Sequence, residues 1–254
     1  MLRGQVMQQA VVSTPPPVAS GPNCSLCTFT QATNSGNTGV HTDPTSFVSA
    51  TTAGHMLIVF GFHDHGSGTG TTHASNAPNA ATWHPCNSGS STADSPEIFI
   101  SGTGSGAFYL SCNYAVNIPG ASSDTVTIQS SDCVSVNCSV GGSYLEFAGI
   151  STTASVAFDG FQTVANATST SGTNNTNCGT ASTSQTNDLI ICGTDQSTGS
   201  TSTAGTTPVT FTLRQPATNV GVESVVWTST GSMTAAMTDS SSGDLYAGWE
   251  IFLK

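Results

Sequence analysis

Four of the six histidines lie close together in the chain, in a stretch that is otherwise rich in Gly, Thr, Ala and Asn: His63, His65, His73 and His84. His63 and His65 are two residues apart at the end of an apolar run, so in a strand their side chains point to the same side. With His73 or His84 as a third ligand, this pair would form a divalent metal site with an open position for water. We favour solvent-facing loop histidines instead, because no glutamate follows the pair as a cupin-type site requires. No other cofactor is predicted.

Glu146 and Glu250 fall inside otherwise apolar runs, YLEFAG and GWEIF. On the concave face of a β-sandwich, two carboxyl groups roughly 5 to 9 Å apart serve as the catalytic pair of many glycosidases. Strand alternation alone also places polar residues on an outer face, and this structural interpretation is the one we favour. The sequence has no nucleophile elbow, phosphate loop or dinucleotide fingerprint, so an enzyme is not the leading prediction.

Aromatic residues could also form a sugar-stacking platform, although most of them lie on strand-like runs and are expected in the core. The residues considered are Trp83, Tyr109, Tyr144, Trp227, Tyr246 and Trp249.

The chain has eight cysteines, and they do not show the paired CxxC spacing of a zinc site. An even set of this kind predicts disulfides formed in an oxidising compartment. Cys133 and Cys138 could close a local loop, and Cys112 and Cys192 lie in strand-like runs, but the connectivity does not follow from the sequence. The expected disulfide cysteines are Cys24, Cys27, Cys86, Cys112, Cys133, Cys138, Cys178 and Cys192.

Charged residues make up only 7% of the chain, with three basic residues against fourteen acidic ones and a net charge of -11. Such a chain cannot neutralise a phosphate backbone, so nucleic acid is excluded as a partner. Ser and Thr exceed their ordinary usage and supply the polar surface, which indicates an extracellular or cell-surface protein. Four sequons offer glycosylation sites, at Asn23, Asn137, Asn166 and Asn174.

No apolar run is long enough for a membrane span, and the first twenty residues lack the apolar segment of a signal peptide. We therefore expect that a signal has been removed or that export uses another route.

Alternation of apolar and polar residues is the dominant pattern, and helical periodicity is missing. Two segments place apolar residues on one face and predict strands packed on one side: 106–116 (Phe108, Leu110, Cys112, Tyr114, Val116) and 244–254 (Leu245, Ala247, Trp249, Ile251, Leu253). Residues 54–63 and 187–193 are continuous apolar runs, typical of strands covered on both faces. Together with several further short strands separated by turn residues, they predict an all-β fold: a two-sheet antiparallel β-sandwich of jelly-roll type, stapled by disulfides.

The expected organisation is an extended N-terminal arm with a proline-rich spacer over residues 1–23, followed by one sandwich domain over 24–254. A low-complexity loop is expected near 166–187, tied down by Cys178 alone. The segment 5–13 is uncharged and compatible with a β-strand, so it could add to a sheet edge of a neighbouring subunit and build a filament, or fold back on its own domain.

The succession GHMLIVFGF, FYLSCNYAVNIPGASSDTVTIQSS, GGSYLEFAGI, AFDGF, NDLIICGTD and LYAGWEIFLK resembles secreted bacterial jelly-roll modules of surface and extracellular proteins. The resemblance covers most of residues 25–254 and is carried by strand and turn residues. It implies a fold, together with attachment, display or glycan contact, and no defined reaction. The cysteine count and the histidine-rich insert depart from the pattern of these modules.

The leading functional prediction is an extracellular structural or adhesive protein, and one form of it is a homo-oligomer or filament joined through its N-terminal arm. The alternatives are a carbohydrate-binding module or glycosidase with a glycan partner, and a His-centred metalloprotein.

Overall fold

The computed structural model describes residues 24–35, 42–65, 70–101, 107–131, 133, 138–196, 201–216 and 220–254, without the side chains of His65 and Pro216. The expected N-terminal arm (1–23) and the sequons Asn23 and Asn137 lie outside these residues.

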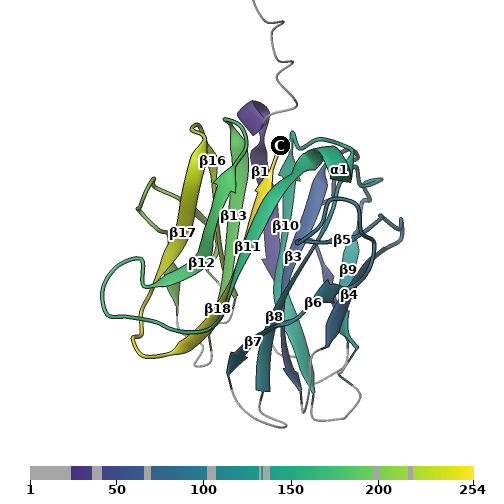
Figure 1. Ribbon diagram of the computed structural model, residues 1–254. Helices are drawn as coiled ribbons and strands as arrows, with labels where there is room; N and C mark the ends of the chain where they lie inside the picture. The colour runs from purple at the N-terminus through teal and green to yellow at the C-terminus, as the bar shows by residue number, and fades with distance from the viewer. Residues whose placement is uncertain are drawn as a thin grey trace, which may run out of the picture.

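The first half of the chain builds two facing antiparallel sheets (Figure 1). Sheet I has the order β1-β10-β3-β8-β5, and β7 also pairs with β8; sheet II has the order β2-β9-β4-β6. Their strands are β1 (Thr28–Asn34), β2 (Thr42–Ser46), β3 (Met56–His65), β4 (Thr71–Ala77), β5 (His84–Pro85), β6 (Ser95–Pro96), β7 (Ile98–Ser101), β8 (Ala107–Ala115), β9 (Thr125–Ser130) and β10 (Ser139–Ala148). A 3-10 turn, η1 (Cys24–Leu26), precedes β1.

The second half follows the short helix α1 (Ala154–Ala157) and builds two further sheets. Sheet III has the order β11-β18-β13-β16-β15, and sheet IV has the order β12-β17-β14. Their strands are β11 (Phe158–Thr168), β12 (Thr176–Thr183), β13 (Asp188–Gln196), β14 (Ser202–Thr203), β15 (Thr212–Pro216), β16 (Val220–Trp227), β17 (Gly231–Asp239) and β18 (Leu245–Leu253).

The two halves repeat one topology. In sheet I the order β1-β10-β3-β8 places the first strand beside the last, and sheet III repeats it as β11-β18-β13-β16. The facing sheets correspond in the same way, as β2-β9-β4 and β12-β17-β14. This interleaving of strands between two sheets is the order of a jelly roll. The expected disulfide-stapled antiparallel β-sandwich is therefore confirmed, with a sheet count of four instead of the two expected.

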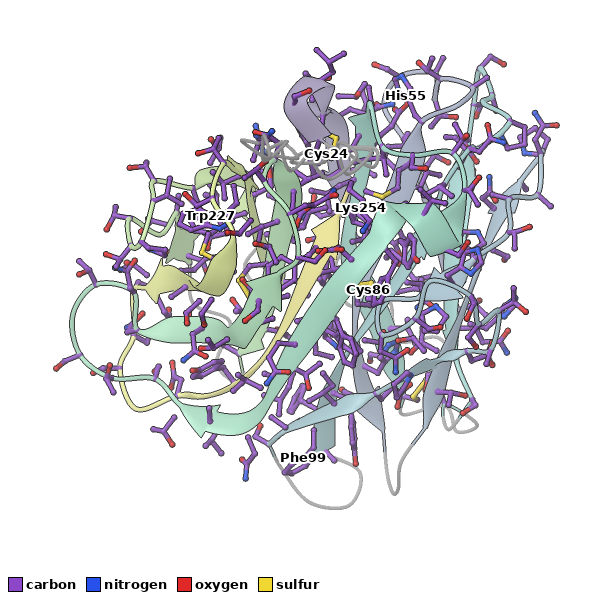
Figure 2. The ribbon with its side chains drawn as sticks, turned by 45° about the horizontal axis from the view of Figure 1, so that its top comes forward. Cys24, His55, Cys86, Phe99, Trp227 and Lys254 are labelled. Atoms are coloured by element: carbon purple, nitrogen blue, oxygen red, sulfur yellow. A yellow bond between two sulfur atoms is a disulfide. The ribbon has the colours of Figure 1, made fainter. Side chains whose placement is uncertain are left out.

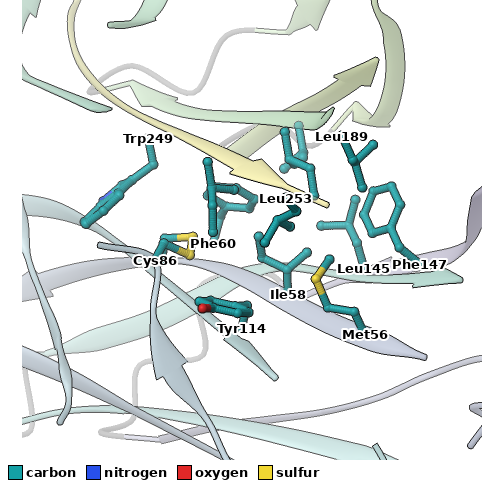
Figure 3. Close-up of a cluster of buried hydrophobic side chains, with 14 of the residues drawn as sticks. Met56, Ile58, Phe60, Cys86, Tyr114, Leu145, Phe147, Leu189, Trp249 and Leu253 are labelled. Atoms are coloured by element: carbon teal, nitrogen blue, oxygen red, sulfur yellow. A yellow bond between two sulfur atoms is a disulfide. The ribbon is translucent and has the colours of Figure 1, made fainter. Parts of the chain in front are cut away.

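The four sheets stack in layers around three hydrophobic cores. The central core lies between sheets I and III, where Ile58, Phe60 and Leu145 meet Trp249 and Leu253 (Figure 3). The first outer core joins sheets I and II, and the second outer core joins sheets III and IV. Sheets I and III are thus covered on both faces, which explains the continuous apolar runs in β3 and β13.

Close approach of the two halves depends on a glycine. A Cβ added to Gly193 of β13 would lie 2.3 Å from the Phe60 ring of β3, so only a residue without a side chain fits beneath that ring. A hydrogen bond of 2.9 Å from Ser143 Oγ to the carbonyl of Val220 joins the same two sheets.

Two expectations from the sequence are corrected. Strands β8 and β18 are buried on both faces, because each lies in a central sheet with a core on either side. The expected loop over 166–187 contains strand β12, which pairs with β17.

Candidate functional site

The histidine-rich segment is not a solvent-facing loop, as the sequence led us to expect. It contributes β3, β4 and β5, and His63 is fully buried in the first outer core. His63 Nε2 lies 2.9 Å from the hydroxyls of both Ser111 and Thr72, and 4.0 Å from Glu97 Oε1. Glu97 in turn accepts hydrogen bonds from Thr72 and from Ser130. This buried polar network joins sheet I to sheet II.

The other two histidines of this segment with described side chains, His73 and His84, point elsewhere. His73 lies on the outer side of β4, with Nδ1 2.9 Å from Asp94 Oδ1. His84 Nδ1 lies 2.7 Å from the carbonyl of Ser91, and its ring packs against Tyr114. In the described part of the chain, no group of three His, Cys, Asp or Glu side chains is placed to hold a metal ion. The structure therefore does not bring His63, His73 and His84 together.

A pocket of about 290 Å³ lies beside strand β4 of the first sandwich. Its walls come from β4, from the segments 80–83 and 92–94, and from Asn113 of β8. Strand β6 pairs with β4 only at Thr71 and Thr72, so the pocket occupies the space beside the rest of that strand. Polar side chains that face it include His73, Asn76, Asp94 and Asn113, and Trp83 provides an aromatic wall.

Asn76 holds the 80–83 wall in place. Its Oδ1 accepts hydrogen bonds from the backbone N–H of Ala81 (2.8 Å) and from Trp83 Nε1 (3.3 Å). Its Nδ2 donates to the carbonyl of Asn79 and to Asp124. Because both ends of the amide are engaged, the pocket wall is pre-formed.

Asn113 differs from Asn76. Its side chain is 2% exposed, yet its Nδ2 has no hydrogen-bond partner among the described residues. Buried amide donors are nearly always paired, so an unpaired one on a residue that lines a pocket requires an explanation.

Glu146 has a structural role. It is fully buried and accepts hydrogen bonds from Gln31 Nε2 (2.6 Å) and the backbone N–H of Thr52 (2.8 Å), with His55 Nδ1 at 2.7 Å. Glu250 lies in the other half of the molecule and faces the second outer core, so the central core separates the two carboxyl groups. The structure does not assemble them into a catalytic pair.

Glu250 instead shares the second outer core with Glu223, which the sequence analysis did not single out. Both are register partners of Cys192, on either side of it, so they lie two strand spacings apart, about 10 Å. Each accepts one backbone N–H, Glu250 from Ala235 (3.1 Å) and Glu223 from Gly205 (2.7 Å). The second oxygen of each has no partner among the described residues.

These environments favour the neutral acids. Burial raises the pKa of Glu250 to about 8, an effect that the Ala235 N–H opposes and the Glu223 carboxyl reinforces. Burial likewise raises the pKa of Glu223 to about 7, against the Gly205 N–H. Both side chains are fully buried, so they accept backbone donors and do not face a substrate.

A second acidic pair, Asp159 and Asp188, lies beside Lys254, which Figure 2 labels. Lys254 Nζ is 2.6 Å from Asp159 Oδ1, and Ser184 donates to the same carboxylate. Burial opposes the ionised form of Asp159, yet the hydrogen bonds from Lys254 and Ser184 bring its pKa to about 2. Burial and the charge of Asp159 raise the pKa of neighbouring Asp188 to about 7. The sequence offered no signal for this pair, because the two residues belong to different strands.

The eight cysteines form four disulfides, as predicted. Two are local, Cys24–Cys27 and Cys133–Cys138, whereas Cys178–Cys192 joins β12 to β13 across the second outer core. Cys86–Cys112 anchors the chain after β5 to β8 beside the central core (Figure 2). Disulfides of this kind indicate a compartment outside the reducing cytosol. Within the described residues, no helix has the length and apolar character needed to cross a membrane.

The expected aromatic platform is not assembled on one surface. Tyr109, Tyr144, Tyr246 and Trp249 are buried, Trp227 is half-buried, and Trp83 lines the pocket beside β4. Of the two described sequons, Asn166 is exposed, whereas the Asn174 amide donates to Thr206 and Thr207.

Comparison of the chain with protein-family models and with curated proteins finds no match.

Proposed function

We propose that the protein is a structural component of an extracellular or cell-surface assembly, joined to its neighbours by the addition of the segment 5–13 to a sheet edge. The composition supports a location outside the cell, since an almost uncharged, hydroxyl-rich surface combined with disulfides is typical of secreted proteins. The buried carboxyl groups support a structural role, because they accept backbone donors inside the cores.

The observation that carries the assembly proposal is an incomplete sheet edge. Strand β14 pairs with β17 only at Thr238 and Asp239, so within the described residues the remainder of that β17 edge has no strand beside it. Gly205 packs against the carbonyl of Ala236, which limits the open edge to residues 231–235. The N–H of Ala235 is already donated to Glu250, and the other backbone groups of this five-residue edge, about 17 Å long, are those that an incoming strand would pair with. The nine residues of 5–13 are long enough to cover it.

The test compares the full chain with a chain that lacks residues 1–20, by light scattering after size exclusion and by negative-stain electron microscopy. We expect concentration-dependent oligomers or fibres from the full chain and monomers from the truncated chain. A double variant, Met7→Pro with Val11→Pro, should also prevent assembly, because proline removes the N–H groups that an added strand donates.

The matched control is Gln8→Ala with Gln9→Ala, which keeps every backbone donor of the segment and should assemble normally. A full chain that stays monomeric at high concentration would contradict the proposal. Equal assembly of the proline and alanine variants would show that any association uses another surface.

A further inference from the structure

The pocket beside β4 has the size of a small ligand. A volume of 290 Å³ corresponds to a sphere about 8 Å across, near the lower limit of about 300 Å³ for ligand pockets. An added five-residue strand would be about 17 Å long and does not fit such a space. The segments 80–83 and 92–94 close the pocket on the side away from β4. A single ring-sized molecule is therefore the occupant that the dimensions favour.

Asn113 shows where a ligand would be held. Asn113 lines the pocket, and its Nδ2 is removed from solvent and has no acceptor among the described residues. A buried donor without a partner is costly, and a ligand oxygen that accepts from it would remove that cost. The amide of Asn76 is already engaged by Ala81, Trp83 and Asp124, so its role is to keep the wall rigid.

The mouth of the pocket carries an oriented imidazole. Asp94 holds His73 through Nδ1, which leaves Nε2 as the ring nitrogen available to a ligand. The two side chains are 60% and 40% exposed, so a molecule entering the pocket can reach both. An exposed carboxylate on a protein of net charge -11 disfavours anionic ligands.

The remaining walls are apolar or carry hydroxyls. Trp83 and the alanines Ala74, Ala80, Ala81 and Ala93 form apolar surface, and Ser75, Thr82 and Thr92 add hydroxyl groups. A neutral sugar ring matches this combination, because it presents C–H groups to aromatic and apolar surface and hydroxyls to amide, imidazole and carboxylate groups.

We propose that this pocket is a binding site for a single neutral sugar residue, with a sugar oxygen accepting from Asn113 Nδ2 and hydroxyls contacting His73 and Asp94. The site lies on the first sandwich, whereas the β17 edge lies on the second, so the proposal stands independently of assembly through the segment 5–13.

The test titrates the full, ¹⁵N-labelled chain with neutral monosaccharides, with N-acetylglucosamine and with glucuronic acid, up to about 100 mM. Two resonances report the site directly: the side-chain amide of Asn113 and the indole N–H of Trp83. We expect at least one neutral sugar to shift both resonances in a saturable manner, and glucuronic acid to bind more weakly. His73→Ala should weaken binding about five- to tenfold, the loss expected for one or two hydrogen bonds.

Asn113→Asp replaces the donor by an acceptor at nearly constant volume and should abolish binding. If that variant does not fold, sugar binding by Asp94→Asn is compared with binding by the unmodified chain instead, because the Asp94 side chain is partly exposed. Ser182→Ala, an exposed hydroxyl substitution on β12, is the matched control and should bind like the unmodified chain.

Three results would overturn the proposal. The first is the absence of any saturable shift, which would mean that ordered water alone fills the pocket. The second is an equal effect of His73→Ala and Ser182→Ala, and the third is preference for the acidic sugar. The assembly test has separate readouts, so either proposal can fail without the other.

Discussion

The substitution Glu250→Gln is expected to stabilise the protein at neutral and alkaline pH. Glutamine has the shape of the neutral acid and keeps an oxygen for the Ala235 N–H, but it cannot ionise. The carboxyl pKa rises from 4.5 in its ordinary state to about 8 in the folded protein. A shift of about 3.5 units corresponds to about 5 kcal/mol.

The sign follows from proton linkage. Because the folded pKa is raised, the folded state retains a proton that the unfolded state releases above pH 4.5. This contribution to stability is complete below pH 4.5 and is lost progressively as the pH rises towards 8. Glu223, whose pKa is about 7, adds a second loss of about 3 kcal/mol over pH 4.5 to 7. Between pH 4.5 and 7, Glu250 and Glu223 together lower the free energy of unfolding by up to about 2.7 kcal/mol for each unit that the pH rises.

The assay is urea-induced unfolding with the disulfides intact, at half-unit intervals from pH 4 to 9. Glu250→Gln should reduce the slope between pH 5 and 6.5 by about 1.4 kcal/mol per pH unit, because Glu223 and Asp188 still contribute there, and should be more stable than the unmodified chain at pH 8.5. The control is Glu146→Gln, at a position that is equally buried but accepts from Gln31 and Thr52 and pairs with His55. That variant should lose about 1 to 3 kcal/mol. An unchanged slope in Glu250→Gln would refute the assignment of a neutral, buried acid.

Three further predictions concern packing, cross-links and the second acidic pair. Gly193→Ala should lower the free energy of unfolding by about 1 to 3 kcal/mol in thermal denaturation, because its Cβ would meet the Phe60 ring; an unchanged Tm would contradict this close packing. Replacing both Cys86 and Cys112 by Ala should cost about 3.5 kcal/mol, and the same change at Cys133 and Cys138 about 2 kcal/mol, because the closed loops span 26 and 5 residues; urea titrations that reverse this order would oppose the loop-entropy explanation. Asp188→Asn should stabilise the chain above pH 7 and not below pH 4, since the raised pKa of Asp188 makes its ionisation unfavourable in the folded state; a gain that is equal at both pH values would argue against it.

The sequence predicted the central core well. The apolar sets of 106–116 and 244–254 contribute Leu110, Cys112, Tyr114, Trp249 and Leu253 to it, as strand alternation indicates. The continuous runs at 54–63 and 187–193 became β3 and β13, which are covered on both faces. Strand periodicity is a local signal, and for these segments it was sufficient.

The repeat of one topology in two halves was not predictable in the same way. It resides in the order of strand pairing, and pairing joins residues far apart in the sequence, such as Thr28 with Ala148 and Phe158 with Leu253. The two halves also differ in detail, since β6 extends sheet II whereas β15 joins sheet III. Strand β12 escaped detection because its sequence, TNCGTAST, has almost no apolar periodicity.

The candidate site was missed for a related reason. Alternation places Asn113 and Glu250 on the polar faces of their strands, and the polar face of a strand is normally exposed to solvent. In this protein the polar faces of β8 and β18 are covered by sheets II and IV, so these residues lie in the outer cores. His63 on β3 is likewise a polar residue that lies buried in the first outer core.

The polar residues of the outer cores share a physical role that accounts for both the pH dependence and the pocket. The central core is filled by apolar side chains, whereas Glu223 and Glu250 accept N–H groups left free by the segment after β14 and by an irregularity in the pairing of β12 and β17. Both carboxyl groups are fully buried, so their ionisation destabilises the fold, and the second sandwich becomes sensitive to alkali. In the first sandwich, Asn113 occupies an equivalent polar position but has no protein acceptor. The buried polar side chains therefore bind backbone N–H groups in the second sandwich, and in the first they leave an unpaired donor on a residue that lines a pocket.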